Sequence, residues 1–266
     1  MKHITIICLI FSMSIFSRTY ATEQEPDRLI IKGDTMLLHA LPLEHWKKQN
    51  KRHEPLFPDS LSGVSSGCWR GYIAYWEIID NRLYLTNIFN GELTAKVNLK
   101  SLFAEKVKDG RVYAEWFSET VTAYKGKLLY YMNMGFSSIF EHEFEYSFEK
   151  GLLKNASYFD NSLSKNTPFY GGIRKLNSTI DSLINWQALP PITETIKVQL
   201  SVEANELGHV DSILSIRGNN EIFIQEAIRV ARLFKKMPVI YKRGKHMKFS
   251  FILPFTFSEK KQKENM

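Results

Sequence analysis

The sequence predicts an α+β fold in two parts: a β-rich part, then a smaller part in which helices and strands alternate. From residue 28 to about residue 148, short apolar runs rich in aromatic and β-branched residues predominate. Beyond residue 173, apolar residues recur at helical spacing between runs of strand character. Residues 155–167 between them are polar, rich in Ser and Asn, and aperiodic. We therefore expect a β-rich domain at residues 22–155, a linker at 156–175, an α+β domain at 176–258 and a charged tail at 259–266.

The first 21 residues have the pattern of a cleavable signal peptide. Lys2 and His3 precede an apolar run at residues 4–16, and Ala21 offers a cleavage site before a polar stretch. A run this short is poorly suited to spanning a bilayer, which takes about 20 apolar residues. We therefore expect export to the periplasm or cell envelope, with no stable membrane span after cleavage.

Charge and cysteine content narrow the partners and the chemistry. Removal of the leader takes away Lys2 and Arg18 and lowers the formal charge from +7 to +5. In an envelope compartment this mild basic excess favours anionic lipid or an acidic partner over nucleic acid. Only Cys68 remains after cleavage, so an intramolecular disulfide is excluded and the fold must be stabilised by packing alone.

The β-rich part begins with two predicted hairpins. Residues 28–31 and 35–38 form the first, with Gly33 able to supply a positive φ at the turn. Residues 72–79 and 82–89 form the second, around the turn Asp80-Asn81. Both faces of the run at 72–79 are largely apolar, which is typical of a strand in the middle of a sheet.

Further elements complete this part. The patterns predict a short helix at residues 95–105 and strands at 112–117, 127–134 and 140–148. In the last strand Glu141, Glu143 and Glu145 alternate with aromatic residues, so we expect one acidic face and one core face.

The C-terminal part has a distinct order of elements. Apolar spacing predicts a helix at residues 219–237, with Pro238 limiting it. The other expected elements are a helix at 173–186, strands at 195–202 and 210–216 around a turn at Gly208, a turn at 242–245 and a final strand at 247–257 that contains Pro254.

Three segments of this part resemble the C-terminal domain of TonB: "IKVQLSVEANELGHVDSILSIRG", "EAIRVARLFKKMP" and "RGKHMKFSFILPFTF". The resemblance covers residues of about 183–257. The matching elements, in chain order, are Gly208, His209, Val210 and Asp211 at the first hairpin, Glu226 and Ala227 on the helix, Met237 and Pro238 after it, Gly244 and Lys245 at the second turn, and Pro254 and Phe257 at the end.

The resemblance implies a three-stranded antiparallel sheet backed by a helix, with the last strand as an exposed edge. Such an edge can accept an extended peptide as an additional strand. In TonB proteins the peptide belongs to an outer-membrane TonB-dependent transporter, and we expect a protein partner of that kind here. The corresponding edge consists of Lys248, Phe249, Ser250, Phe251, Ile252 and Leu253.

The chain departs from TonB at its N-terminal side. TonB proteins that transduce energy keep an N-terminal membrane helix and a long Pro-rich spacer, and this sequence shows neither pattern. We therefore expect no energy transduction unless the signal sequence is retained. The phrases "CWRGYIAYWEI", "VYAEWFS", "GKLLYYMNMGF" and "FEKGLL" make residues 22–155 similar to a group of bacterial proteins of unassigned function.

The candidate chemical motifs are weak. Cys68 has no base nearby in sequence, which favours a small buried thiol over a nucleophile. On a strand, His142 points away from Glu141 and Glu143, so we expect no metal site there. Trp69-Arg70 fits either a recognition pair or a core Trp capped by Arg, the latter being favoured.

We therefore expect a binding protein that is not an enzyme, with no catalytic residues, cofactor or metal. The basic group Lys235, Lys236, Lys242, Arg243, Lys245, His246 and Lys248 could steer an acidic partner to the edge strand. Two alternatives stay open. The module could be structural, for example in a homodimer formed through the same edge, or the first part could hold an enzyme site too scattered to recognise.

Overall fold

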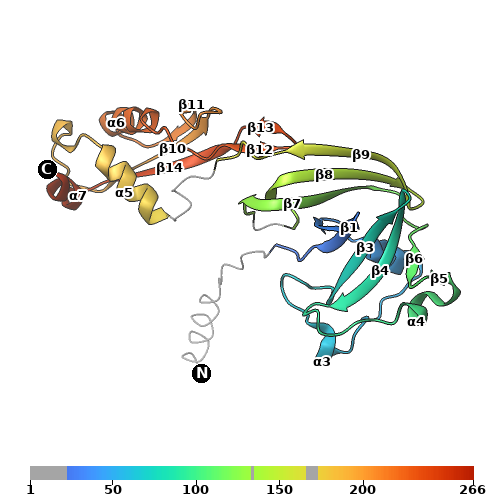
Figure 1. The fold of residues 1–266 in the computed structure, drawn as a ribbon. Helices are drawn as coiled ribbons and strands as arrows, with labels where there is room; N and C mark the ends of the chain where they lie inside the picture. Colours follow the sequence, from blue (N-terminus) through green and yellow to red (C-terminus); the bar gives the residue numbers. More distant parts are fainter. Residues whose placement is uncertain (1–22, 133–134, 166–172) are drawn as a thin grey trace, which may run out of the picture.

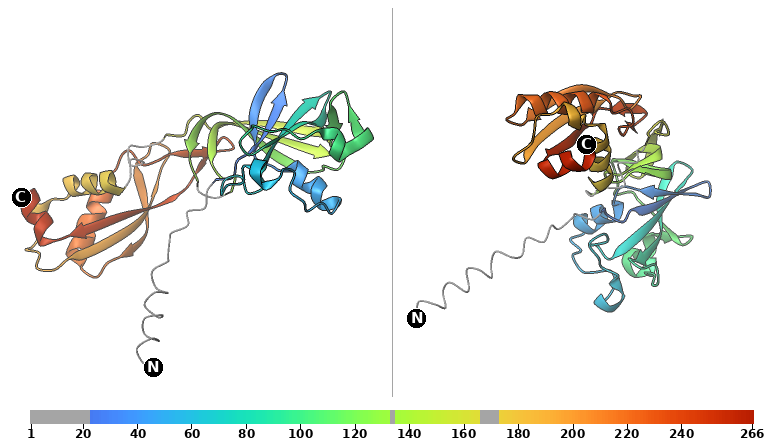
Figure 2. Two further views of the ribbon diagram at one scale, coloured as in Figure 1. Left: turned by 90° about the horizontal axis from the view of Figure 1, so that it is seen from below. Right: turned by 90° about the vertical axis from the view of Figure 1, so that its left-hand side faces the viewer.

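The computed structural model describes residues 23–132, 135–165 and 173–266. The expected signal peptide and part of the expected linker lie outside the described residues. The fold is α+β and strand-rich, as predicted. Its described strands form a nine-stranded sheet, a three-stranded sheet and a two-stranded hairpin. Figures 1 and 2 show the two larger sheets one after the other along the length of the molecule.

The nine-stranded sheet has the strand order β3-β1-β2-β7-β8-β9-β4-β6-β5, with an additional β3–β4 pairing that bends it into a partly closed barrel. Among the described strands of this sheet, β1 and β3 form the one parallel pair. Its strands are β1 (Asp27–Ile31), β2 (Asp34–Leu38), β3 (Tyr72–Ile79), β4 (Arg82–Asn90), β5 (Val107–Lys108), β6 (Arg111–Tyr113), β7 (Thr120–Tyr130), β8 (Ile139–Glu149) and β9 (Leu152–Asp160). Its helices are α2 (Pro42–Gln49), α3 (Asp59–Ser62) and α4 (Leu99–Phe103), followed by a 3-10 turn at Ala104–Lys106.

Both predicted hairpins of this sheet are confirmed. β1 pairs with β2 around Gly33, whose φ is +84°. β3 pairs with β4 around Asp80 and Asn81, whose φ values are 47° and 60°. The prediction of a central strand is also confirmed, because β3 lies between β1 and β4. Two later predicted boundaries were wrong. The strand predicted at residues 112–117 is β6, which ends at Tyr113, and the strand predicted at 127–134 is β7, which begins at Thr120.

The core of this sheet contains a buried ion pair. The side chains of Asp27 and Arg70 are both 0% exposed, and Arg70 Nη2 lies 3.0 Å from Asp27 Oδ1. Trp76 Nε1 donates to the other carboxylate oxygen at 3.0 Å, and the Ala74 N–H donates to Oδ1 at 3.1 Å. Burial raises the pKa of Asp27, while the Arg70 charge and these hydrogen bonds act in the opposite direction. The network ties the loop before β3 to the first residue of β1.

The C-terminal elements surround a second, apolar core. Leu253, Phe255 and Phe257 pack there with buried residues of the neighbouring strands and helices. The elements are α5 (Ile173–Leu183), a 3-10 turn at Trp186–Ala188, β10 (Ile196–Ala204), β11 (Val210–Arg217), α6 (Glu221–Arg232), β12 (Ile240–Lys242), β13 (Lys245–Met247), β14 (Ser250–Phe257) and α7 (Glu259–Asn265).

Two expectations about irregular segments were wrong. The expected linker begins inside β9, which continues to Asp160 because its backbone pairs with β8, even though its side chains lack a strand pattern. The expected charged tail is α7, capped by the Ser258 side chain. Gln262 of α7 is buried and accepts a hydrogen bond from the Ile192 N–H at 3.1 Å.

Candidate functional site

The candidate binding surface is the outer edge of β14. This strand pairs antiparallel with β10 in eight residue pairs, from Ile196↔Phe257 to Glu203↔Ser250. The sheet order is β11-β10-β14, so within the described part of the chain no strand pairs with the other side of β14. An edge of this kind offers backbone N–H and C=O groups to an incoming strand.

Side chains alternate strictly along β14. Leu253, Phe255 and Phe257 are at most 1% exposed and face the helices, whereas Ile252 is 55% exposed on the open face. Alternation places Ser250, Pro254 and Thr256 on the same open face as Ile252. The buried side chains therefore hold the strand in place and leave its outer edge and open face accessible.

Pro254 indicates which backbone groups of β14 point away from β10. Proline lacks an N–H group, so within a sheet its nitrogen faces the unpaired side of an edge strand. Because N–H direction alternates along a strand, the N–H groups of Ser250 and Ile252 also point away from β10. An incoming strand finds two donors in succession before Pro254 and a missing donor at Pro254 itself. The edge before the proline is thus the better docking segment.

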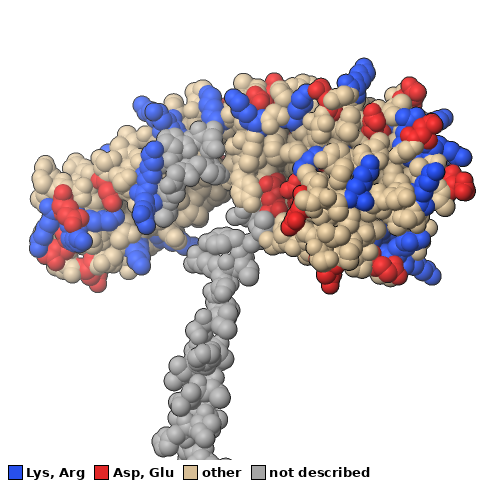
Figure 3. Space-filling view, turned by 60° about the horizontal axis from the view of Figure 1, so that its bottom comes forward, with Lys and Arg blue, Asp and Glu red and all other residues tan. Residues whose placement is uncertain are grey.

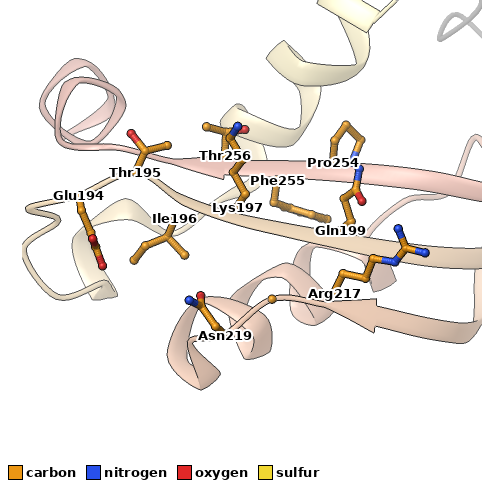
Figure 4. A pocket seen from close by; sticks show the side chains of 11 residues that line it. Glu194, Thr195, Ile196, Lys197, Gln199, Arg217, Asn219, Pro254, Phe255 and Thr256 are labelled. Carbon is orange, nitrogen blue, oxygen red and sulfur yellow. The ribbon is translucent and has the colours of Figure 1, made fainter.

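A hollow of about 760 Å³ lies on the open face at the far end of β14. Figure 4 shows side chains from β10, β11 and β14 around it, among them Lys197, Arg217 and Thr256. Glu194 and Gln199 also line it. Its lining carries both charge signs and suits a polar side chain of an extended chain segment.

Two of the predicted edge residues lie outside β14. Lys248 and Phe249 connect β13 to β14, and the ring of Phe249 lies 6.0 Å from that of Tyr130 in the first part. The prediction of one strand from residue 247 was wrong because residues 245–247 pair with β12 in a separate hairpin. Ser250, Phe251, Ile252 and Leu253 do belong to β14.

The β12–β13 hairpin contacts the first sheet through its turn. The Gly244 N–H donates to Asn161 Oδ1 at 3.0 Å, and Arg243 forms an ion pair with Glu145. The Arg243 guanidinium also lies 5.0 Å from the centre of the Phe159 ring. The predicted basic group is therefore divided, because Arg243 is engaged within the molecule. On the face drawn in Figure 3, acidic and basic side chains are interspersed.

The predicted acidic face of β8 lies under this hairpin. Glu143 is 3% exposed, accepts from Asn161 Nδ2 at 3.2 Å and accepts from the Arg243 N–H at 3.3 Å. The expectation of a plain acidic face was incomplete, since sequence periodicity does not show what covers a face. A small hollow of about 240 Å³ beside Glu143 is also lined by His39, Tyr124 and Lys242.

Some of the residues on which the TonB resemblance depends lie around the turn between β10 and β11 and contribute to its packing. Gly208 has φ +82°, and a Cβ atom there would lie 2.9 Å from the Met237 carbonyl oxygen. The Met237 N–H donates to the Gly208 carbonyl at 2.9 Å. Val210 is buried, whereas Asp211 is exposed. This turn therefore packs against the segment that follows α6.

The resemblance positions on α6 and after it also have packing roles. Ala227 is fully buried, as is Phe257, and Pro238 is buried too. Glu226 accepts from the Asn185 N–H at 2.6 Å and from Arg229 Nε at 2.7 Å. Burial raises the pKa of Glu226, but these hydrogen bonds outweigh burial and hold the pKa below its usual value. Glu226 thus fixes the end of α5 to α6.

The motifs weighed for chemistry fall in ordinary environments. Cys68 is buried, its Sγ donates to the Tyr72 carbonyl at 3.4 Å, and burial raises its thiol pKa, which disfavours the nucleophilic thiolate. The His142 ring contacts the Tyr158 hydroxyl at 3.0 Å. Among the described residues no group of three or more His, Cys, Asp or Glu side chains could hold a metal ion.

The favoured expectation of a core Trp69 capped by Arg70 was wrong, because the burial of the two residues is reversed. Trp69 is 56% exposed, whereas the Arg70 side chain is buried against Asp27. Sequence reasoning missed Asp27 because a partner 43 residues away leaves no local signal.

Comparisons with known proteins leave the resemblance to the TonB C-terminal domain as a prediction. No family model matches the chain, and no curated protein or solved structure matches it either. Within residues 23–132, 135–165 and 173–266, the helices are all too short or too polar to cross a membrane.

Proposed function

We propose that the protein binds an extended segment of a protein partner by strand addition to β14, at Ser250, Phe251, Ile252 and Leu253. The observation that supports this most directly is the position of β14 at the edge of its sheet, paired with β10 alone. Main-chain hydrogen bonds to such an edge supply affinity, and alternate side chains supply specificity.

The order of elements supports the TonB-like interpretation of this part. A helix, two hairpin strands, a second helix and a last edge strand follow one another as α5, β10, β11, α6 and β14. This order is the one that the resemblance implies. The added β12–β13 hairpin and α7 distinguish this chain from the minimal arrangement.

The proposed partner is the extended N-terminal segment of an outer-membrane transporter in the same cell envelope. The exposed Ile252 side chain offers an apolar contact to such a segment. The proposed role of the protein is binding, without energy transduction.

An NMR titration of isotope-labelled residues 22–266 with synthetic N-terminal peptides of these transporters tests the proposal. Backbone shifts should concentrate on Ser250 to Leu253. Ile252→Pro should abolish binding, because it removes one outward donor while the hydrogen bonds to β10 come from the alternate residues. Ile252→Val, which keeps the N–H, should bind like the wild type.

Three results would count against strand addition at β14. The first is the absence of shifts at millimolar peptide, and the second is a shift pattern confined to another surface. The third is equal binding by Ile252→Pro and Ile252→Val, since the two variants differ chiefly in the backbone donor.

A further inference from the structure

The open face of the three-stranded sheet holds a hollow that strand addition leaves unused. The hollow of about 760 Å³ is lined by residues at the beginning of β10, the end of β11 and the end of β14. Strand addition at Ser250 to Leu253 engages the outer edge of β14 toward its other end. Small-molecule sites typically have volumes of about 300–1,000 Å³. The hollow is therefore a candidate for a separate small-molecule site.

The strand register places polar side chains from three strands around this hollow. Gln199 lies opposite Arg217, and Lys197 lies opposite Thr256. Lys197 and Gln199 are exposed while Val198 between them is buried, which places these side chains on the open face. Figure 4 shows Lys197 together with Thr256, and Arg217 extending toward Gln199. Hydrogen-bond donors from three adjacent strands thus line one hollow.

Two of these side chains are cations without an acidic partner. Arg229 on α6 is paired with Glu226, whereas within the described part of the chain Lys197 and Arg217 form no ion pair. The two cations are diagonal neighbours on adjacent antiparallel strands, where Cβ atoms lie about 7–8 Å apart and long side chains can meet. Like charges at this spacing repel one another. An anion held between them would relieve the repulsion.

The backbone beside Arg217 is held close to the core. A Cβ atom at Gly218 would lie 3.2 Å from side-chain atoms of both Ile224 and Val198, so a larger residue there would disturb the end of β11. Asn220 then caps α6 with its side chain. These contacts fix the base of the Arg217 side chain and leave its exposed guanidinium able to reach a ligand.

One acidic residue also lines the hollow. Figure 4 shows Glu194 on the segment before β10, at the end of the hollow away from Arg217. Close to Arg217 and Lys197 the lining side chains are neutral, among them Gln199 and Thr256. The charge distribution therefore complements an anion at the Arg217 end, and Glu194 opposes that anion from the other end.

A phosphate group matches this arrangement better than a carboxylate does. A phosphate ester carries a charge of about −1.5 to −2 at pH 7 and three acceptor oxygens, so it can engage both cations and a neutral donor at once. Arg217 offers a planar fork of N–H donors, and Lys197 offers a compact charge. A carboxylate has a single charge and two oxygens.

We propose that this hollow binds the phosphate group of a small molecule, with Arg217 and Lys197 as the charged contacts. Gln199 and Thr256 supply neutral hydrogen bonds. The same chemistry occurs on a soluble phosphate ester and on a phosphate-bearing lipid headgroup. The site is separate from the peptide edge of β14.

An NMR titration of isotope-labelled residues 22–266 with inorganic phosphate tests the site. Saturable shifts should concentrate on Lys197, Gln199 and Arg217, with a dissociation constant of about 1 mM or below. Acetate should bind several-fold more weakly. Shifts that rise linearly with phosphate mean an adventitious ion only and overturn the proposal, as does equal binding of acetate.

Charge variants test the two cations and the opposing acid. Arg217→Gln and Lys197→Gln should each weaken phosphate binding by about fivefold to tenfold, because each removes a charge-assisted hydrogen bond. Glu194→Gln should strengthen binding, because it removes the acid of the lining. Lys236→Gln is the matched control, since Lys236 is exposed after α6 and does not line the hollow. Equal losses in Arg217→Gln and Lys236→Gln would show a general effect of net charge and overturn the proposal.

Competition experiments identify the source of the phosphate. Displacement of inorganic phosphate by phosphatidylcholine vesicles that contain phosphatidic acid would support a lipid headgroup, and displacement by glycerol phosphate alone would support a soluble ester. Failure of both to displace it overturns the proposal. Ile252→Pro should leave phosphate binding unchanged, because the donor that it removes belongs to the peptide edge. The two proposals can therefore fail separately.

Discussion

The two larger sheets differ in the number of polar side chains that are buried beside them. The first contains the buried polar side chains of Asp27, Ser62, Arg70, Asn90, Ser138, Glu143 and Asn161. The second contains apolar side chains, with Gln262 as its one buried polar side chain among the described residues. The first sheet therefore combines an apolar cluster with buried polar contacts such as the Asp27–Arg70 pair, whereas the second depends almost entirely on the packing of apolar residues.

The edges of the two sheets differ in a related way. β14 carries Pro254, which removes one outward donor and limits pairing to the segment before it. β9 carries no proline, but its pairing register with β8 shifts at Lys154. The two edges thus differ in the residue that interrupts regular pairing along them.

The largest effect should come from the buried ion pair of the first sheet. Asp27→Ala leaves Arg70 buried without its counter-charge and should lower the free energy of unfolding by roughly 3–5 kcal/mol. Asp34→Ala is the matched control, because Asp34 is 70% exposed beside Lys125 and should cost about 1 kcal/mol or less. Denaturant unfolding measures both. Equal losses would mean that the Asp27 network contributes little.

The second sheet should respond to side-chain volume on one face of β14 only. Leu253→Ala, at a residue 1% exposed, should cost roughly 2–5 kcal/mol. Ile252→Ala, one residue earlier and 55% exposed, should change stability by about 0.5 kcal/mol or less. A large loss for Ile252→Ala in denaturant unfolding would show that another surface covers the open face.

Acid should destabilise the first sheet through His39. Burial lowers its pKa to about 4, with Arg28 and Lys242 adding to the shift, against about 6.5 in an unfolded chain. Between these values the unfolded chain binds more protons, so stability is complete above about pH 6.5 and falls by up to about 3 kcal/mol as the pH approaches 4. His39→Gln should remove this part of the pH dependence in unfolding curves recorded from pH 7 to 4. Unchanged slopes would exclude His39 as the source.

The smallest expected effects concern the hairpin glycines. Gly208→Ala should cost about 1–3 kcal/mol, because φ is +82° and the new Cβ would contact the Met237 carbonyl. Gly33→Ala should cost only about 1 kcal/mol, because φ is similar but nothing lies within 4 Å of the added Cβ. Thermal unfolding of the two variants separates the effect of the Met237 contact from the effect of backbone strain. Equal losses of stability would mean that the segment at Met237 moves aside without a cost in free energy.

The sequence by itself determined the elements whose signals are local. The turn residues Gly33, Asp80 and Asn81 predicted the first two hairpins because they tolerate positive φ. Helical spacing predicted α6, although the helix expected at residues 219–237 extends five residues beyond its end at Arg232. The missing N–H of Pro254 can also be read from the sequence, since it is a property of the residue alone.

Tertiary structure decided the features that depend on distant partners. β9 is a strand because β8 supplies its hydrogen bonds, and its polar side chains gave no sign of that pairing. α7 is anchored because Gln262 reaches the backbone at Ile192. Asp27 is buried because Arg70 and Trp76 meet it across more than 40 residues. These contacts join segments that carry no local mark of one another, so the free edges of both sheets could be located only once the strands were paired.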